Sequence, residues 1–336
     1  GNGVHFLSHK KQQVTRRFYH DVSDKEGIRS NSVYSLLVDD RGAVWVGHFQ
    51  AGLDYSLYQN GLFRTYAYPP LFNSANLSIR SFISRGQEKV IGSRDGLFYI
   101  NEATGMVKSF VKPVLTSDLI LTISFYQGEY YIGTYGGGMM VLNPETLSLK
   151  YFSQSDTELF QKGHIFCVKP DTKGNLWIGT SQGLFNYNGQ TKQIKHFTSA
   201  NSQLPEGNVY EVSFDSTGKG WIATETGMCI YDPASQNLRS NVFPEGFVNK
   251  DKVRTIYEDS EHNLYFIREK GSLFTSTLTM DRFYNQSVFS TLPDNSLMAI
   301  VEDNQGWLWV GCNDGLLRIK KEGEEYDAFT FNDGVP

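Results

Sequence analysis

The chain has 336 residues, of which 40% are hydrophobic and 20% are charged, and it carries a net charge of −5 at neutral pH. This is an ordinary soluble composition, and its acidity is the opposite of the basic face expected of a protein that binds nucleic acid. No apolar run approaches the ~18 residues of a membrane span, so we expect neither a nucleic-acid partner nor direct insertion of these residues into a membrane.

The first segment, residues 1–20, has the pattern of two short strands. It matches the second half of the repeats that follow it, such as the stretch from Gly183 to Phe197, but it lacks their first half. We therefore expect residues 1–20 to form a half-blade, an outer pair of strands without its inner pair.

Residues 21–331 contain one short motif seven times. Its clearest copy is Leu176-Trp177-Ile178-Gly179, and the second residue of the motif recurs at positions 45, 90, 131, 177, 221, 265 and 309, in steps of 41 to 46 residues. Self-similarity at a period of about 40–45 residues, with each unit all-β, is the signature of propeller blades. The sequence therefore predicts one all-β domain, a seven-bladed β-propeller of four-stranded antiparallel blades, with no helix longer than a turn or two.

Each repeat is predicted to hold four strands. An apolar strand such as Val209 to Phe214 comes first, and a turn such as Asp215-Ser216-Thr217-Gly218 follows it, in which Asp accepts backbone hydrogen bonds and Gly supplies a positive φ. The second strand carries the motif, whose aromatic residue can pack on the neighbouring blade and whose glycine lets backbone approach closely. The third strand begins at a Gly-Leu pair, and the fourth ends in an aromatic residue.

The seventh blade has two possible sources of outer strands, residues 3–19 and residues 315–331. The connection at Gly315-Leu316 is short, and local pairing is the easier event. We therefore expect residues 315–331 to complete their own blade, and residues 332–336 to be the lead-in to a following segment.

No pattern in the sequence signals catalysis, a metal site or a cofactor. The Asp-Gly turns lack the ligand spacing of a calcium loop, and Gly136-Gly137-Gly138 is not followed by the Gly-Lys-Ser/Thr of a phosphate loop. Cys167, Cys229 and Cys312 form no CxxC pair and are expected to be buried. Among seven histidines only His48, directly after a motif, is a candidate metal ligand or general base. We predict no catalytic residue, no metal and no cofactor, although paired carboxylates of a glycosidase cannot be placed from sequence alone.

Polar and aromatic residues gather in the loops between the second and third strands. In a propeller these loops share one face with the connections between blades, around the mouth of the central channel, where aromatic platforms and planar polar groups suit a sugar. The alternative is that the loops are polar only because they are exposed to solvent. The residues expected to contact a ligand are His48, Phe49, Gln50, Arg94, Asp95, Tyr135, Gln182, Glu225, Arg268, Glu269, Asn313 and Asp314.

Two kinds of contact are expected at this face. Arg94 and Arg268 can donate paired hydrogen bonds to hydroxyls or to a uronic carboxylate, and Tyr135 and Phe49 can stack on a pyranose ring. A competing site is a protein interface formed by aromatic residues of the outer strands.

The stretch from Asp171 to Tyr187 reads D-x-x-G-x-L-W-I-G-T-x-x-G-L-x-x-Y, a pattern that closely resembles the two-component regulator propeller repeat. Lead-ins such as Asn31-Ser32-Val33 add to the resemblance, which covers essentially the whole chain and is weakest in repeats two, three and six.

The resemblance implies a role in sensing. Such propellers form the extracytoplasmic, here periplasmic, sensor region of hybrid two-component histidine kinases anchored in the inner membrane, and many members respond to oligosaccharides. It further implies that the partners are an oligosaccharide or other small ligand and an adjacent propeller and signalling domains of the same chain. A homodimer with a second copy is a further option. A propeller enzyme (a glycan lyase or a glycoside hydrolase) and a pure protein scaffold stay open as alternatives.

Overall fold

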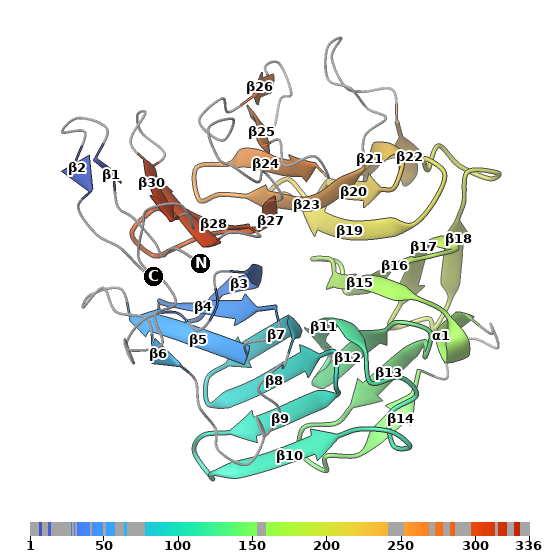
Figure 1. Cartoon of the computed structure of the whole chain (residues 1–336). Coiled ribbons are helices and arrows are strands. Elements are labelled where there is room, and N and C mark those ends of the chain that lie inside the picture. The colour runs from blue at the N-terminus through green and yellow to red at the C-terminus, as the bar shows by residue number, and fades with distance from the viewer. Residues whose placement is uncertain are drawn as a thin grey trace.

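The computed structural model describes residues 7–8, 13–14, 28, 30, 32–40, 42–49, 52–57, 64–65, 78–152, 159–240, 252–268, 273–277, 283–285, 297–312, 315–320 and 326–329. These residues form seven four-stranded antiparallel sheets arranged in a ring (Figure 1). The four strands of each sheet follow one another in chain order, so each sheet is one blade. The predicted seven-bladed propeller is therefore confirmed.

The strands of the first four blades have the following bounds: β3 (Val33–Val38), β4 (Ala43–His48), β5 (Gly52–Leu57) and β6 (Arg64–Thr65); β7 (Ile79–Arg85), β8 (Glu88–Ser93), β9 (Leu97–Asn101) and β10 (Met106–Phe110); β11 (Ile120–Tyr126), β12 (Glu129–Thr134), β13 (Met139–Leu142) and β14 (Leu149–Tyr151); β15 (Ile165–Pro170), β16 (Asn175–Thr180), β17 (Gly183–Asn188) and β18 (Ile194–Phe197).

The last three blades are formed by β19 (Val209–Phe214), β20 (Gly220–Thr224), β21 (Gly227–Asp232) and β22 (Asn237–Arg239); β23 (Val253–Glu258), β24 (Asn263–Arg268), β25 (Leu273–Thr277) and β26 (Phe283–Asn285); β27 (Leu297–Glu302), β28 (Trp307–Cys312), β29 (Gly315–Lys320) and β30 (Tyr326–Phe329). One short helix, α1 (Leu159–Lys162), precedes β15. No helix among the described residues is long and apolar enough to cross a membrane.

A single carboxylate builds the turn between the first two strands of a blade. In the fifth blade Asp215 Oδ1 accepts the backbone N–H of Thr217 at 2.9 Å and of Lys219 at 3.0 Å, as the sequence predicts. Its Oδ2 also accepts the indole N–H of Trp221, six residues on, at 2.8 Å. Equivalent side-chain bonds join Asp39 to Trp45, Asp171 to Trp177, Asp259 to Tyr265 and Asp303 to Trp309.

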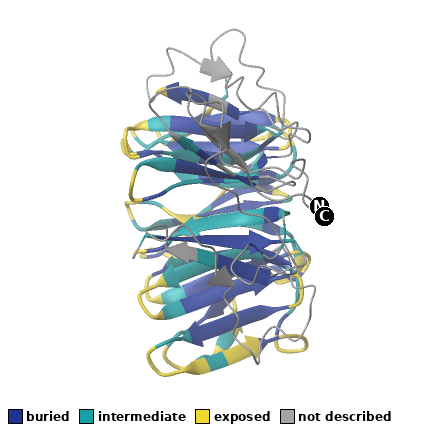
Figure 2. Ribbon diagram, turned by 60° about the vertical axis from the view of Figure 1, so that its left-hand side comes forward, coloured by how far each residue is buried: buried dark blue, intermediate teal, exposed yellow. Residues whose placement is uncertain are grey.

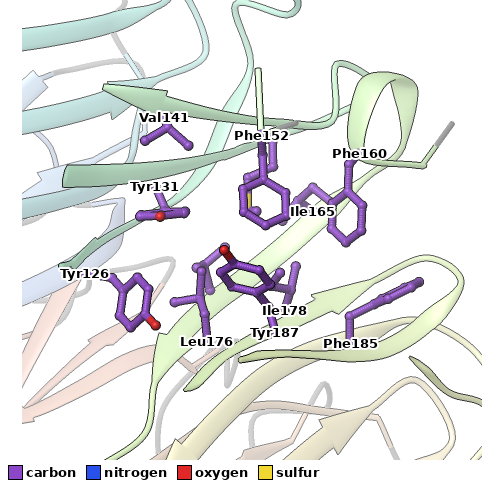
Figure 3. Packing of buried hydrophobic residues seen from close by; sticks show 12 residues of the cluster. Tyr126, Tyr131, Val141, Phe152, Phe160, Ile165, Leu176, Ile178, Phe185 and Tyr187 are labelled. Carbon is purple, nitrogen blue, oxygen red and sulfur yellow. The ribbon is translucent and has the colours of Figure 1, made fainter. Parts of the chain in front are cut away.

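The core lies between the blades. Seen from the side, the second strands of the blades are buried, whereas outer strands such as β10 and β14 and the connections are largely exposed (Figure 2). Between the third and fourth blades the ring of Phe152 packs edge-on against Phe160, with centroids 5.4 Å apart, and against Tyr187 at 5.1 Å (Figure 3). The motif glycines permit this close approach: a Cβ on Gly179 would lie 2.7 Å from the carbonyl oxygen of Val209 in the next blade.

The ring closes where β27 lies beside β3. Val33, Val44 and Val46 of the first blade form one buried cluster with Trp309 and Leu316 of the seventh. The outer strands of the seventh blade are β29 and β30, as predicted. The pair β1 (Leu7–Ser8) and β2 (Gln13–Val14) is a separate two-stranded sheet, with β1 beside β30. Residues 332–336, the predicted lead-in, lie outside the described residues.

Candidate functional site

The innermost strand of every blade contains a β-bulge at its second residue. In β19, for example, the register of pairing with β20 jumps between Val209 and Glu211. The same jump occurs in β3, β7, β11, β15, β23 and β27. A bulge re-aims the side chain of its extra residue and is common beside functional sites. The seven bulged residues are Tyr34, Arg80, Leu121, Phe166, Tyr210, Arg254 and Met298.

These seven residues, here called the bulge ring, line one cavity of about 260 Å³ together with Lys252 and Thr255. The innermost strands surround the centre of the ring (Figure 1). The bulges lie at the ends of these strands where the loops from second to third strands meet the connections between blades. The backbone N–H of Tyr135 donates to Leu119 O at 2.9 Å at this end, for example. The cavity therefore opens at the predicted loop face, and we call it the channel-mouth cavity.

Three cations line the channel-mouth cavity: Arg80, Lys252 and Arg254. The Arg80 guanidinium lies 4.7 Å from the ring centroid of Tyr34, and Lys252 Nζ lies 4.7 Å from that of Tyr210, both in cation–π geometry. The described lining residues include no carboxylate. In a protein with a net charge of −5, this is a local concentration of positive charge that attracts anions.

A row of neighbouring aromatic rings runs from this cavity to the rim of the loop face. Tyr135 stacks on His164 with centroids 4.0 Å apart, His164 lies 6.2 Å from Phe166, and Phe166 lies 5.1 Å from Tyr210. Tyr135, at the outer end, is 50% exposed. We call these four residues the aromatic row. Its exposed ring gives the cavity a flat apolar approach.

A second stack flanks the cavity in the first blade. Phe49, one of the predicted site residues, stacks on Tyr34 of the bulge ring with centroids 5.2 Å apart. Its backbone N–H donates to Ser32 O at 2.8 Å, which fixes the loop after β4 to the start of β3.

The other described loop residues lie at the face but not in the cavity. Arg94, Asp95, Gln182 and Glu225 are all exposed. The backbone N–H of Arg94 donates to Ser78 O at 3.0 Å, so the loop that carries Arg94 is held beside the start of β7. None of these four lines the channel-mouth cavity. The predicted residues that the structure brings together with the bulge ring are thus Tyr135 and Phe49.

His48 occupies a different position from the one expected. It is the last residue of β4 rather than a loop residue, its side chain is fully buried, and its Nε2 lies 2.8 Å from Asp54 Oδ2. In the fourth blade the equivalent Thr180 donates its hydroxyl to Gly183 O at 2.8 Å, so this position bridges second and third strands. Such burial does not support contact between His48 and a ligand at the loop face.

Arg268 is likewise the last residue of a strand, β24, and is half-buried. The remaining predicted site residues, Gln50, Glu269, Asn313 and Asp314, lie outside the described residues.

The bulge ring was not predicted from the sequence, although the sequence contains a pattern that indicates it. Each innermost strand begins with a buried aliphatic residue, and the next position is an arginine in two blades, at Arg80 and Arg254. An arginine directly after the first buried residue of an inner strand indicates a side chain that faces the channel rather than the neighbouring blade.

The described residues offer little for metal or thiol chemistry. Within the described ranges no group of three or more His, Cys, Asp or Glu side chains gathers as a metal site. Cys167 and Cys229 are buried free thiols, as predicted, and burial raises the pKa of both. The side chain of Cys312 lies outside the described residues.

Three segments of the chain, residues 27–50, 160–182 and 291–314, match the two-component regulator propeller family. They fall in the first, fourth and seventh repeats. The fourth repeat contains the stretch from Asp171 to Tyr187, whose pattern resembles this family. No curated protein matches the chain significantly.

Several solved structures share the fold. The extracellular domain of the putative hybrid two-component system BT4673 from B. thetaiotaomicron superposes with a TM-score of 0.68 at 17% identity, covering 99% of this chain and 40% of that one. The corresponding domain of BT3049 from the same organism gives a TM-score of 0.59 at 20% identity, covering 100% of this chain and 53% of that one.

PorZ, a surface component of the type-IX secretion system of Porphyromonas gingivalis, gives a TM-score of 0.69 at 14% identity, covering 90% of this chain and 48% of that one. The chain thus spans between 40% and 53% of the length of these three proteins. At such identities the likeness establishes the fold.

Proposed function

We propose that this propeller, which carries two-component regulator propeller repeats, is the ligand-sensing part of a hybrid two-component histidine kinase and has no catalytic role of its own. Its ligand is an oligosaccharide, bound at the channel mouth. The sensor lies in the periplasm, outside the inner membrane, and signals through other domains of the same protein.

One observation carries the proposal: an aromatic row with an exposed outer end leads into a polar cavity where all seven blades converge. Ligand sites favour concave places in which a few polar groups surround an apolar floor. A sugar offers both an apolar ring face, for Tyr135, and a rim of hydroxyl groups, for the arginines of the cavity.

The comparisons with solved structures support a place for this propeller in the extracellular part of a two-component system. Two of the similar structures are described as extracellular domains of putative hybrid two-component systems, and this chain spans 40% and 53% of them. In our proposal an adjacent propeller and the signalling domains make up the rest of the protein, and a second copy of the chain can pair with it.

A propeller hydrolase is the main competing function. A glycoside hydrolase needs two carboxyl groups on either side of the scissile bond, and the described residues that line the channel-mouth cavity provide none. We therefore favour binding without turnover.

The test is thermal unfolding of the propeller with a panel of glycans, combined with analysis of the products. A ligand that binds only the folded state raises the unfolding temperature, and we expect such a rise with no change in the glycan. Release of shorter products would overturn the sensor function.

A matched pair of variants locates the site. Tyr135→Ala removes the exposed end of the aromatic row, whereas Tyr151→Ala removes an equally exposed ring, 50% exposed in each case, from the outer strand β14. We expect the first to weaken glycan binding by about 1 kcal/mol, roughly fivefold, and the second to leave it unchanged. Equal affinities would move the site off this face.

A further inference from the structure

We infer that the channel mouth selects an anionic sugar, with Arg80, Arg254 and Lys252 binding its carboxylate or sulfate group. The inference rests on the proposed function, because it names the class of oligosaccharide that the sensor takes.

The bulges place the two arginines on nearly opposite sides of the channel. Arg80 belongs to β7 of the second blade and Arg254 to β23 of the sixth, and both are the extra residue of their bulge. Lys252 directly precedes β23, on the same side as Arg254. All three line one cavity of about 260 Å³. An anion in this cavity is therefore approached by cations from both sides.

Arg80 has no counter-ion among the described residues. Its one interaction there is with the face of Tyr34, at 4.7 Å, and its buried Nε has no hydrogen-bond partner. A guanidinium presents five N–H donors in a planar fork that matches a carboxylate or a sulfate. A bound anion would supply the counter-charge that Arg80 lacks among the described residues. The site is thus built for negative charge.

The aromatic row accounts for the rest of the ligand. Phe166 and Tyr210 belong to both the cavity and the row, so a ligand whose anionic group lies among the arginines continues directly along the aromatic row. The outer stack of Tyr135 on His164 is flat, with 21° between the ring planes. A pyranose ring matches such a surface better than an acidic peptide does, because the peptide would use the cations but not the row.

The experiment is calorimetric titration of the folded propeller with matched glycans of equal length: an oligogalacturonate, a sulfated galacto-oligosaccharide and a neutral galacto-oligosaccharide. A poly-glutamate peptide is titrated in parallel. We expect at least one anionic glycan to bind about 10- to 100-fold more tightly than the neutral one, since charge-assisted hydrogen bonds are lost without the anion. The preference should shrink as ionic strength rises. The carboxylated and sulfated arms identify which anion is recognised.

Variants of the cations separate charge from geometry. Arg80→Gln and Arg254→Gln should each weaken binding of the anionic glycan about 10- to 100-fold and leave the neutral glycan nearly unaffected. Arg80→Lys keeps the charge but loses the fork, so it should fall between wild type and Arg80→Gln. Lys195→Gln removes an exposed cation from the outer strand β18 and should change nothing. The urea midpoint of each variant verifies that it is folded.

The outcomes distinguish this inference from the function on which it rests. If wild type and Arg80→Gln bind neutral and anionic glycans equally, selection of an anion is wrong and the sensor function stands. If the peptide binds and no glycan does, both are wrong. Tighter binding of the anionic glycan that survives replacement of both arginines would place the anion elsewhere and overturn the assignment of these residues.

Discussion

At the scale of single residues, one aspartate in each of five blades does more than open a turn. Asp171 shows the full arrangement: Oδ1 accepts the backbone N–H of Asn175 at 2.8 Å, and Oδ2 accepts the indole N–H of Trp177 at 2.9 Å. A buried indole N–H needs an acceptor, and the carboxylate also holds the turn before the strand. The spacing of six residues therefore joins turn and strand into one unit, which the repeat copies.

We predict that Asp215→Ala lowers the free energy of unfolding by about 3 kcal/mol. The change removes charge-assisted hydrogen bonds and leaves the N–H of Trp221 buried without its acceptor. Urea denaturation monitored by tryptophan fluorescence measures the loss. Asp40→Ala, which removes an exposed carboxylate from the turn of the first blade, is the control and should cost less than about 0.5 kcal/mol. Similar losses in the two variants would contradict the role given to the indole bond.

At the scale of strands, side chains tie one blade to the next. Glu88 of β8 accepts the hydroxyl of Tyr99 from its own blade and that of Tyr130, at 2.9 Å, from the third blade. Burial, reinforced by the hydrogen bond to Glu88, raises the pKa of Tyr99 to about 12, and the same two causes raise that of Tyr130 further. This pair of phenols therefore links β9 and β12 only while it stays protonated.

The raised pKa values predict a loss of stability at high pH. An unfolded tyrosine ionises near pH 10, whereas the folded protein holds Tyr99 and Tyr130 neutral at that pH. The stability from these groups is full below about pH 10 and falls as the pH rises through the folded values. The urea midpoint should thus decrease between about pH 10 and pH 12.

Substitutions test this assignment. The double variant Tyr99→Phe and Tyr130→Phe should show a shallower decrease, because it has two fewer phenols to ionise on unfolding. Tyr151→Phe, at a half-exposed position, should keep the slope of the wild type. An unchanged slope in the double variant would assign the alkaline loss to other groups.

At the scale of the whole molecule, the repeat made the architecture predictable. Seven copies of one motif predicted seven blades, and the short link at Gly315-Leu316 predicted that the last blade completes itself. The close approach at the motif glycine was also predictable: a Cβ on Gly133 would lie 2.9 Å from Ile165 O of the next blade. These features follow from local sequence, because chain order and blade order are the same.

The site was less predictable because it depends on register. The loops that carry Tyr135 and Phe49 could be assigned to one face from the repeat. The bulges could not be predicted, because the alternation of buried and exposed residues in a strand with one extra residue looks much like that of an ordinary strand. Without the bulge, Arg80 and Tyr210 look like the polar side of a strand rather than members of one ring. His48 was misplaced for a related reason, since the end of β4 lies one residue beyond the motif.

The closed ring predicts that every interface between neighbouring blades, here called a seam, contributes equally to stability. In a ring each blade has two neighbours, so the seam between the ends of the chain is built like the others. Leu316 packs with the first blade at this seam and is 1% exposed, and Leu184, in the same Gly-Leu pair of the fourth blade, packs toward the fifth and is 0% exposed. We expect Leu316→Ala and Leu184→Ala each to cost about 2–5 kcal/mol, as for other buried leucines. Urea unfolding of both variants, in one transition of unchanged steepness, is the measurement. A cost below about 1 kcal/mol for Leu316→Ala alone would mean that the ring is open at this seam in solution.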